Sequence, residues 1–301
     1  MAIPLETTYL LFSPAKVNIQ LQILARQESG YHHLWMDLFP IDLFDQILLF
    51  PAKEELWQKN KNPAEQLLVS CLEKLSFLVN QKIICDFRLV KILPWGAGVG
   101  SSSGNAGTLL RFFQQKILPQ TAACLMDWEA LALSIGSDVP FFLNPQAAIA
   151  TQRGEKLHPI AFPTPFPVVL YQPPFPHSTQ EVFERFDAFG GVVKKIPKKE
   201  RMSLKEVFHL PPETNQFWNP SLPHFEEFLK IREIFFQFSG VKNVLLTGSG
   251  SCLVLYFENQ ADRDFFFYKQ QNQAFRLLNG GQFYSCHLCS KMDLAYFELP
   301  R

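Results

Sequence analysis

The sequence has no surplus of charge of either sign. Its 28 Lys and Arg residues match its 28 Asp and Glu residues. A nucleic-acid partner needs a basic surface that attracts phosphates, and a neutral chain offers no general one. The most basic stretch contains Lys194, Lys195, Lys198, Lys199 and Arg201, and we interpret it as a surface loop. We therefore expect no nucleic-acid partner.

Long apolar runs are missing as well. No run reaches the roughly 18 residues that a membrane-spanning helix needs, and residues 1–6 lack the basic region and long apolar stretch of a secretory signal. The six cysteines are scattered mostly in apolar segments, which is typical of buried free thiols in a reducing compartment. We therefore expect a cytoplasmic protein without a membrane partner, present as a monomer or a weak homodimer.

A second cysteine pair is also lacking. Cys286 and Cys289 have the C-x-x-C spacing of a half zinc site, but a structural zinc ion needs two further ligands. We interpret this segment as part of a terminal strand, and we expect no metal site built from the chain's own residues.

The chain has no internal repeat and no low-complexity segment. Of its 301 residues, 47% are hydrophobic and 19% are charged, which provides a full core and excludes a disordered protein. This length allows one large domain or two of ordinary size. Helix-like and strand-like patterns alternate without a long linker, which predicts an α+β protein of two layered lobes. The 30 phenylalanines have no functional explanation at this stage.

The feature that stands out is a Gly/Ser run from Gly96 to Asn105. A strand-like segment, residues 83–92, precedes it, and apolar residues at helical spacing follow it from Leu109 to Phe113. A strand, a glycine-rich loop and a helix start gather free backbone N–H groups, and the helix dipole adds to their attraction for a phosphate. An ordinary glycine-rich turn is the alternative that this run alone leaves open.

Three other segments carry polar residues in unusual places. Lys16 and Asn18 share one face of an alternating strand, which is either a solvated edge or the floor of an active site. Asp138 lies between a serine and a Val-Pro-Phe run, where it either caps a helix or serves as a functional carboxylate. Residues 247–250 form a small-residue turn between two strands, which either makes a simple hairpin or brings backbone close to a ligand.

Taken together and in this order, these segments resemble the motifs of the GHMP small-molecule kinases. The blocks are Pro14–Asn18 with Gly30–Leu34, the Gly96–Ala106 loop, and Leu246–Gly250. Within that superfamily the first block, and the segment Ser137–Phe142, are similar to the 4-diphosphocytidyl-2-C-methyl-D-erythritol kinases. These are ATP-dependent enzymes of the non-mevalonate isoprenoid pathway. The resemblance covers most of the chain, from about Ser13 to Phe257.

The resemblance implies a catalytic pair. Asp138 would take the proton from the substrate hydroxyl as this attacks the γ-phosphate. Lys16 would hold Asp138 ionised and offset the developing phosphoryl charge. ATP and Mg²⁺ are the implied cofactors. The implied nucleotide contacts are Lys91, Pro94, Gly96, Ala97, Gly98, Val99, Gly100, Ser101, Ser102, Ser103, Gly104 and Asn105.

The resemblance also implies a small-molecule substrate with a cytidine diphosphate moiety. Tyr31 and Phe183 would sandwich the cytosine ring, and His32 would read its edge. Asn18 would orient the substrate near Asp138. The full set of implied substrate contacts is Asn18, Tyr31, His32, Thr179, Phe183, Thr247, Gly248, Ser249 and Gly250.

Three positions of the loop depart from the family pattern. Ser101 and Ser102 replace glycines, and Gly104 replaces the second serine. If either glycine position requires a positive φ, a serine there costs on the order of 1 kcal/mol. A missing hydroxyl at position 104 would weaken contacts to phosphate or magnesium. We therefore expect nucleotide affinity, more than the reaction, to be affected.

The fold implied by the resemblance has two α+β lobes with the active site in a cleft between them. Residues 1–160 would form the ATP-binding lobe, with a left-handed βαβ unit, and residues 161–301 a sandwich-like α/β substrate lobe. The predicted reaction is the phosphorylation of the 2-hydroxyl of 4-diphosphocytidyl-2-C-methyl-D-erythritol. The alternatives are a GHMP kinase for homoserine, mevalonate or a sugar, and a nucleotide-binding paralogue with weakened catalysis.

Overall fold

The structure, a computed structural model, describes residues 2–26, 30, 32–58, 62–162, 164–175, 177–191, 203–272 and 281–299. Its strands belong to one mixed sheet. They are β1 (Ala2–Pro4), β2 (Thr8–Arg26), β3 (His32–Pro51), β4 (Lys82–Val90), β5 (Ala148–Gln152), β6 (Lys156–Pro159), β7 (Phe166–Gln172), β8 (Val241–Leu246), β9 (Leu253–Phe257), β10 (Gln282–Leu288) and β11 (Ala295–Leu299).

Helices cover this sheet on both sides. A π-helical turn (Phe113–Ile117) extends α2, and short 3-10 turns lie at Leu56–Gln58, Pro63–Glu65 and Pro212–Thr214. The α-helices are α1 (Gln66–Val79), α2 (Ser101–Phe112), α3 (Gln120–Ala123), α4 (Trp128–Ile135), α5 (Val139–Leu143), α6 (Thr179–Ala188), α7 (Leu204–Val207), α8 (Phe225–Phe236) and α9 (Gln260–Asn272).

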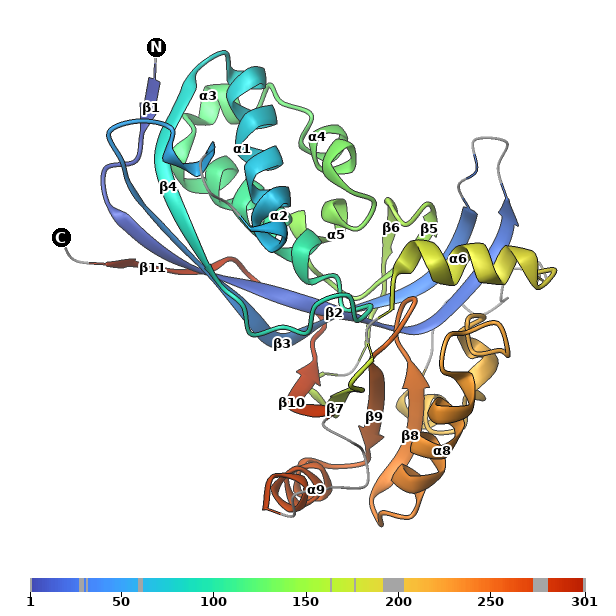
Figure 1. The fold of residues 1–301 in the computed structure, drawn as a ribbon. Helices are drawn as coiled ribbons and strands as arrows, with labels where there is room; N and C mark the ends of the chain where they lie inside the picture. Colours follow the sequence, from blue (N-terminus) through green and yellow to red (C-terminus); the bar gives the residue numbers. More distant parts are fainter. Residues whose placement is uncertain are drawn as a thin grey trace.

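The long antiparallel strands β2 and β3 run across the whole molecule (Figure 1). Helices α1 to α5 gather on one side of them, whereas β7 to β10 with α8 and α9 lie on the other. One apolar cluster fills the first side, and two fill the second side and the junction. This mixed, two-lobed α/β architecture is the predicted fold class.

Strand β3 is the centre of the sheet. It pairs with β2 along most of its length, with β5 near its start and with β4 near its end. The strand is continuous from His32 to Pro51, and its register with β2 shifts near Asp42, since Ala15 pairs with Ile41 and Pro14 with Phe44.

The last strands return to the first ones. Strand β10 pairs with β7 along its length and meets β3 at Leu288 and Ile41, and β11 pairs with β2. Backbone pairing therefore crosses the predicted division at residue 160. That division stays a prediction about lobes.

A second register shift in β2 decides which side chains meet. Between Asn18 and Leu21 the strand has one residue more than β3, so the alternation of faces reverses. Val17 and Ile19 therefore pack in the junction cluster, whereas Leu21 and Ile23 pack on the other face. The sequence predicted a half-buried strand, but both faces are covered, and Lys16 and Asn18 are 5% and 0% exposed. The solvated-edge interpretation is thus wrong.

The cysteines are all free thiols, and Cys71, Cys85, Cys252 and Cys286 are buried while Cys124 is exposed. The predicted strand at Cys286 is confirmed by β10. Within the described residues, every helix is too short or too polar to cross a bilayer. The same residues contain no group of three or more His, Cys, Asp or Glu side chains arranged to hold a metal ion.

Candidate active site

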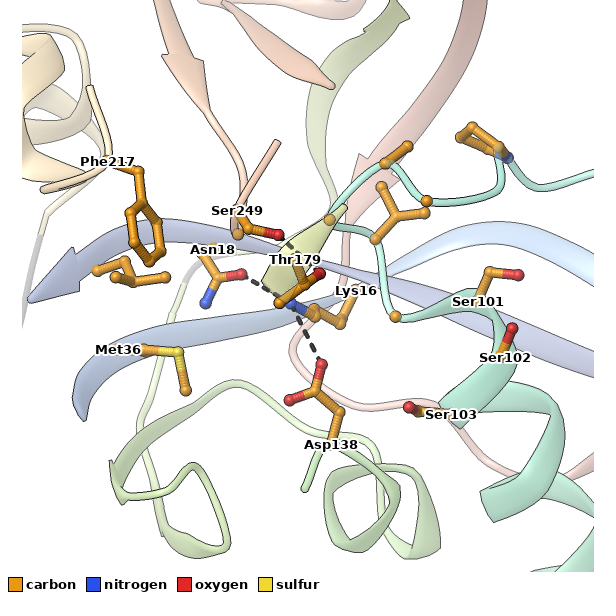
Figure 2. Close-up of a pocket in the computed structure, with 18 of the residues that line it drawn as sticks. Lys16, Asn18, Met36, Ser101, Ser102, Ser103, Asp138, Thr179, Phe217 and Ser249 are labelled. Carbon is orange, nitrogen blue, oxygen red and sulfur yellow. Dashed lines mark hydrogen bonds and ion pairs between the residues drawn. The ribbon is translucent and has the colours of Figure 1, made fainter. Parts of the chain in front are cut away.

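A cavity of about 300 Å³ lies where the two sides of the molecule meet (Figure 2). Seven separate segments line it: β2, β3, the Gly/Ser loop with the start of α2, the turn before α5, helix α6, the segment after the 3-10 turn Pro212–Thr214, and the turn between β8 and β9. The lining residues are Lys16, Asn18, Leu21, Leu34, Met36, Pro94, Trp95, Gly96, Ala97, Gly98, Val99, Gly100, Ser101, Ser102, Ser103, Asp138, Thr179, Phe183, Phe217, Gly248 and Ser249.

A charged pair and an amide lie at the centre of this cavity. Lys16 Nζ donates to Asn18 Oδ1 at 2.8 Å and lies 3.6 Å from Asp138 Oδ2, as Figure 2 shows. A nearly buried ammonium group needs such acceptors because burial removes its water. The Asn18 Nδ2 amide is buried and has no hydrogen-bond partner among the described residues. It is therefore a donor available to a ligand oxygen.

Asp138 immediately precedes α5, but its side chain makes no capping hydrogen bond to that helix. The carboxylate instead faces Lys16, and 34% of the side chain is exposed. The capping interpretation left open by the sequence is not supported. A carboxylate that lies beside a fixed lysine and faces a cavity is suited to accept a proton.

The Gly/Ser loop forms the opposite wall. The first backbone N–H groups of any helix have no intrahelical partner. Gly100, which precedes α2 with a φ of +66°, supplies no side-chain cap, so these groups stay available to a ligand. The hydroxyls of Ser101, Ser102 and Ser103 lie at the same end. Backbone N–H groups, hydroxyls and the positive end of a helix dipole together favour a phosphate.

The loop is held tightly against the turn between β8 and β9. Gly98 has a φ of +75°, and a Cβ atom there would lie 2.2 Å from the carbonyl oxygen of Thr247. Only glycine permits this approach. The Thr247 hydroxyl in turn accepts a hydrogen bond from the Asn18 backbone N–H at 2.8 Å. The turn therefore joins the loop to the strand that carries Lys16 and Asn18.

The loop positions that differ from the family pattern have no strained backbone. Ser101 and Ser102 lie in the first turn of α2, and neither has a positive φ, so the predicted cost of a serine at these positions does not arise. Gly104 packs on β2, and a Cβ atom there would lie 2.5 Å from the Pro14 carbonyl oxygen. A serine at position 104 does not fit this backbone.

Several predicted nucleotide contacts lie behind the cavity wall. Lys91 and Asn105 do not line it, because their side chains donate to Asp45 at 2.7 Å and 3.0 Å. Burial lowers the pKa of Lys91, and the Asp45 carboxylate opposes that shift. Gly104 is also absent from the wall, whereas the rest of the predicted set, Pro94 and Gly96 to Ser103, lines it.

Some of the predicted substrate contacts line the cavity, and others do not. Asn18, Thr179, Phe183, Gly248 and Ser249 line the cavity, and the Thr179 and Ser249 hydroxyls lie 3.0 Å apart.

Thr247, Gly250 and His32 do not line the cavity. The His32 ring stacks on Phe183 with centroids 4.8 Å apart, and its Nε2 lies 2.8 Å from Asp187 Oδ1. Tyr31 lies outside the described residues.

Five lining residues were not predicted: Leu21, Leu34, Met36, Trp95 and Phe217. Simple alternation places Leu21 on the face opposite Asn18, and only the register shift in β2 reverses this. Trp95 immediately precedes the Gly/Ser run, so its position was available as a signal. Phe217 meets Phe183 edge to face at 4.8 Å, but nothing in its own surroundings in the sequence marks it.

Comparisons with known proteins give relatives of nearly the whole chain. No family model matches the chain. The 4-diphosphocytidyl-2-C-methyl-D-erythritol kinase of Methylacidiphilum infernorum is 30% identical over 274 residues, covering 88% of this chain and 91% of the relative. A crystal structure of a 4-(cytidine 5'-diphospho)-2C-methyl-D-erythritol kinase matches with a TM-score of 0.71 and 26% identity, over 92% of this chain and 99% of that one.

The homoserine kinase of Cytophaga hutchinsonii shares the fold, with a TM-score of 0.61 and 14% identity over 95% of this chain and 96% of that one. Identity at that level shows the architecture alone, whereas the relative from Methylacidiphilum shows the family. The chain therefore belongs to the 4-diphosphocytidyl-2-C-methyl-D-erythritol kinase family.

Proposed function

We propose that this protein transfers the γ-phosphoryl group of ATP to the 2-hydroxyl of 4-diphosphocytidyl-2-C-methyl-D-erythritol. The observation that carries the proposal is the group formed by Lys16, Asn18 and Asp138, which faces the Gly/Ser loop across one cavity. Family membership supports the same reaction. Phosphoryl transfer requires a group that accepts the proton of the substrate hydroxyl, and this group must face the loop that binds the phosphates.

In this proposal Asp138 is the general base. It accepts the proton of the substrate hydroxyl while the hydroxyl oxygen attacks the γ-phosphorus. Lys16, 3.6 Å from the carboxylate, pairs with Asp138 and stabilises the negative charge that develops on the transferred group. The free Asn18 Nδ2 amide donates to a substrate oxygen and so orients the erythritol chain.

The phosphates of ATP lie, in this proposal, on the Gly/Ser loop and the first turn of α2. The free N–H groups there and the hydroxyls of Ser102 and Ser103 bind the phosphate oxygens, whereas the Ser101 hydroxyl donates to Asp45. A Mg²⁺ ion would neutralise charge on the phosphates. The hydroxyl oxygens of Ser102 and Ser103 and the Asp138 carboxylate fit a hard cation that is held partly by phosphates.

The cytosine ring is proposed to lie near Phe183, the aromatic side chain of α6 that lines the cavity. His32 Nε2 lies 2.8 Å from Asp187 Oδ1, and in the neutral tautomer that donates from Nε2 to Asp187 the Nδ1 atom carries a lone pair. Such a nitrogen accepts from the exocyclic amino group of cytosine. Homoserine, mevalonate and sugars offer no base for these two rings, which favours the cytidine substrate over the other small alcohols.

The second candidate, a nucleotide-binding paralogue with weakened catalysis, depended on the altered loop. That support is weakened, because Ser101 and Ser102 are helical and Gly104 fits where a serine does not.

We further propose that the protein is a cytoplasmic monomer or weak homodimer. The free cysteines support a reducing compartment. Light scattering tests the assembly state.

The test is an ADP-release assay with ATP and magnesium, in which the cytidine compound, homoserine and mevalonate are offered in parallel. We expect turnover with the cytidine compound alone. Turnover with homoserine or mevalonate would transfer the assignment to another GHMP activity. ATP binding without any turnover would favour the non-catalytic paralogue.

A further inference from the structure

Asp45 is a fully buried carboxylate behind the wall of the cavity. Its Oδ1 atom accepts from the backbone N–H groups of Ile92 and Leu93, both at 2.8 Å. Its Oδ2 atom accepts from Lys91 Nζ at 2.7 Å. A buried charge is tolerated only when such partners replace its water.

Two further donors reach the same Oδ2 atom from beyond the loop. The Ser101 hydroxyl and the Asn105 side-chain amide each donate to it at 3.0 Å. The carboxylate therefore accepts five hydrogen bonds. Three donors come from the chain entering the Gly/Ser loop, and two come from the helix that leaves it.

The segment held between these two sets of donors is the phosphate-binding wall. It contains three glycines with positive φ, Gly96, Gly98 and Gly100, and glycine-rich backbone has many other conformations to adopt. Fixing both ends of such a loop on one buried anion reduces that freedom before a ligand arrives.

Lys91 is fully engaged in the same network. Its ammonium group has three N–H donors, and these are directed to Asp45, the Leu93 carbonyl oxygen and the Ser101 hydroxyl. Its charge is matched by the carboxylate next to it. In this structure Lys91 therefore organises the loop and offers no free N–H to a phosphate.

We propose that Asp45 is a positioning residue for the nucleotide: it fixes both ends of the phosphate loop and the start of α2 without touching the ligand. The proposal rests on the proposed function only in taking the loop as the ATP site. Ser101 adds to this role in this chain, because it stands where the family pattern has a glycine and its hydroxyl donates directly to Asp45.

The test uses the full-length protein and measures the dissociation constants of ATP and of the cytidine compound separately. In Asp45→Asn, one oxygen becomes an amide group that faces the donors. We expect the dissociation constant of ATP to rise at least tenfold and that of the cytidine compound to stay within twofold. A residue that contributes only to stability would change neither constant at a temperature well below unfolding.

The control is Asp42→Asn, on the same strand. Asp42 pairs with His287 at 2.7 Å and is not part of the Asp45 network, so we expect ATP binding within twofold of the wild type. If Asp45→Asn does not fold, Asn105→Ala serves instead. It removes one donor from outside the cavity, and we expect ATP binding to weaken three- to fivefold.

Unchanged ATP affinity in the folded Asp45→Asn protein, or equal losses for both ligands, would overturn the positioning role. The proposed function fails separately, by absence of wild-type turnover with the cytidine compound. The ratio of ATP affinities between the variant and the wild type does not depend on that turnover.

Discussion

At the scale of single residues, the geometry around Lys16 gives each neighbour a distinct part. Asn18 Oδ1 accepts a hydrogen bond from the ammonium group, and the Asp138 carboxylate faces it. The residue types could be predicted from the sequence because the segments resemble a family. Their proximity could not, because Lys16 and Asp138 lie on segments far apart in the chain and only the fold brings them together.

We predict that Asp138→Asn lowers kcat by about 10²- to 10⁴-fold, the usual contribution of a general base. The amide has the same shape and no basic oxygen, so the dissociation constant of the cytidine compound should change little. Steady-state rates and a binding titration measure the two effects. Near-normal kcat in the variant would remove Asp138 from this role.

Asp37 gives a prediction about pH. It is 3% exposed and accepts one hydrogen bond from Gln20 at 3.0 Å. Burial raises its pKa to about 7, against the opposing effect of that bond. The folded state therefore binds a proton that the unfolded state, with a carboxyl pKa of about 4, has already lost. Stability should fall as pH rises from about 4 to 7, by on the order of 4 kcal/mol at most.

Urea unfolding at pH 5 and pH 8 tests this expectation. Asp37→Asn should flatten the pH dependence and be more stable than the wild type at pH 8, because no charge is buried. Asp293→Asn is the control, since that side chain is 88% exposed. A wild-type stability equal at both pH values would contradict the expectation.

At the scale of elements, the close packing of α2 on β2 shapes the site. The sequence predicts both elements and the loop before the helix. It does not predict that Gly104 is a contact point. In the sequence, a glycine next to serines indicates only a missing hydroxyl, and the Pro14 carbonyl oxygen opposite it is visible only in the structure. The register shift after Asn18 is hidden in the same way, since it depends on the partner strand.

We predict that Gly104→Ala destabilises the protein by about 1–3 kcal/mol, the usual cost of overpacking. The new methyl group would lie 2.5 Å from the Pro14 carbonyl oxygen, so α2 must shift away from β2. Thermal unfolding measures the change. Ser102→Ala, in the same helix turn, should leave the unfolding temperature nearly unchanged; equal unfolding temperatures for both variants would refute this packing argument.

At the scale of the whole molecule, one sheet unites the two lobes. Strands β10 and β11 complete pairings with β3 and β2, and the cavity takes its walls from both sides. The fold class could be predicted from the alternation of elements and the family resemblance. The return of the last strands could not, because pairing between distant segments leaves no periodic signal in either one.

We predict that a fragment of residues 1–160 does not fold cooperatively by itself. It lacks the segments that pair with β2 and β3 from the end of the chain and would expose their apolar faces. Circular dichroism with urea titration is the measurement, with the full chain as the control. A sharp, cooperative transition in the fragment would show that the lobe division at residue 160 is also a folding boundary.

The two long strands have a mechanical consequence. Strands β2 and β3 run between the two sides of the molecule, so both sides are attached to the same pair of strands, and Lys16 and Asn18 lie part-way along β2. Bending of such a strand pair displaces the ends of the strands most and their middle least. Relative motion of the two sides would then be transmitted through this strand pair, while the spacing of Lys16 and Asn18, which lie two residues apart on β2, stays constant.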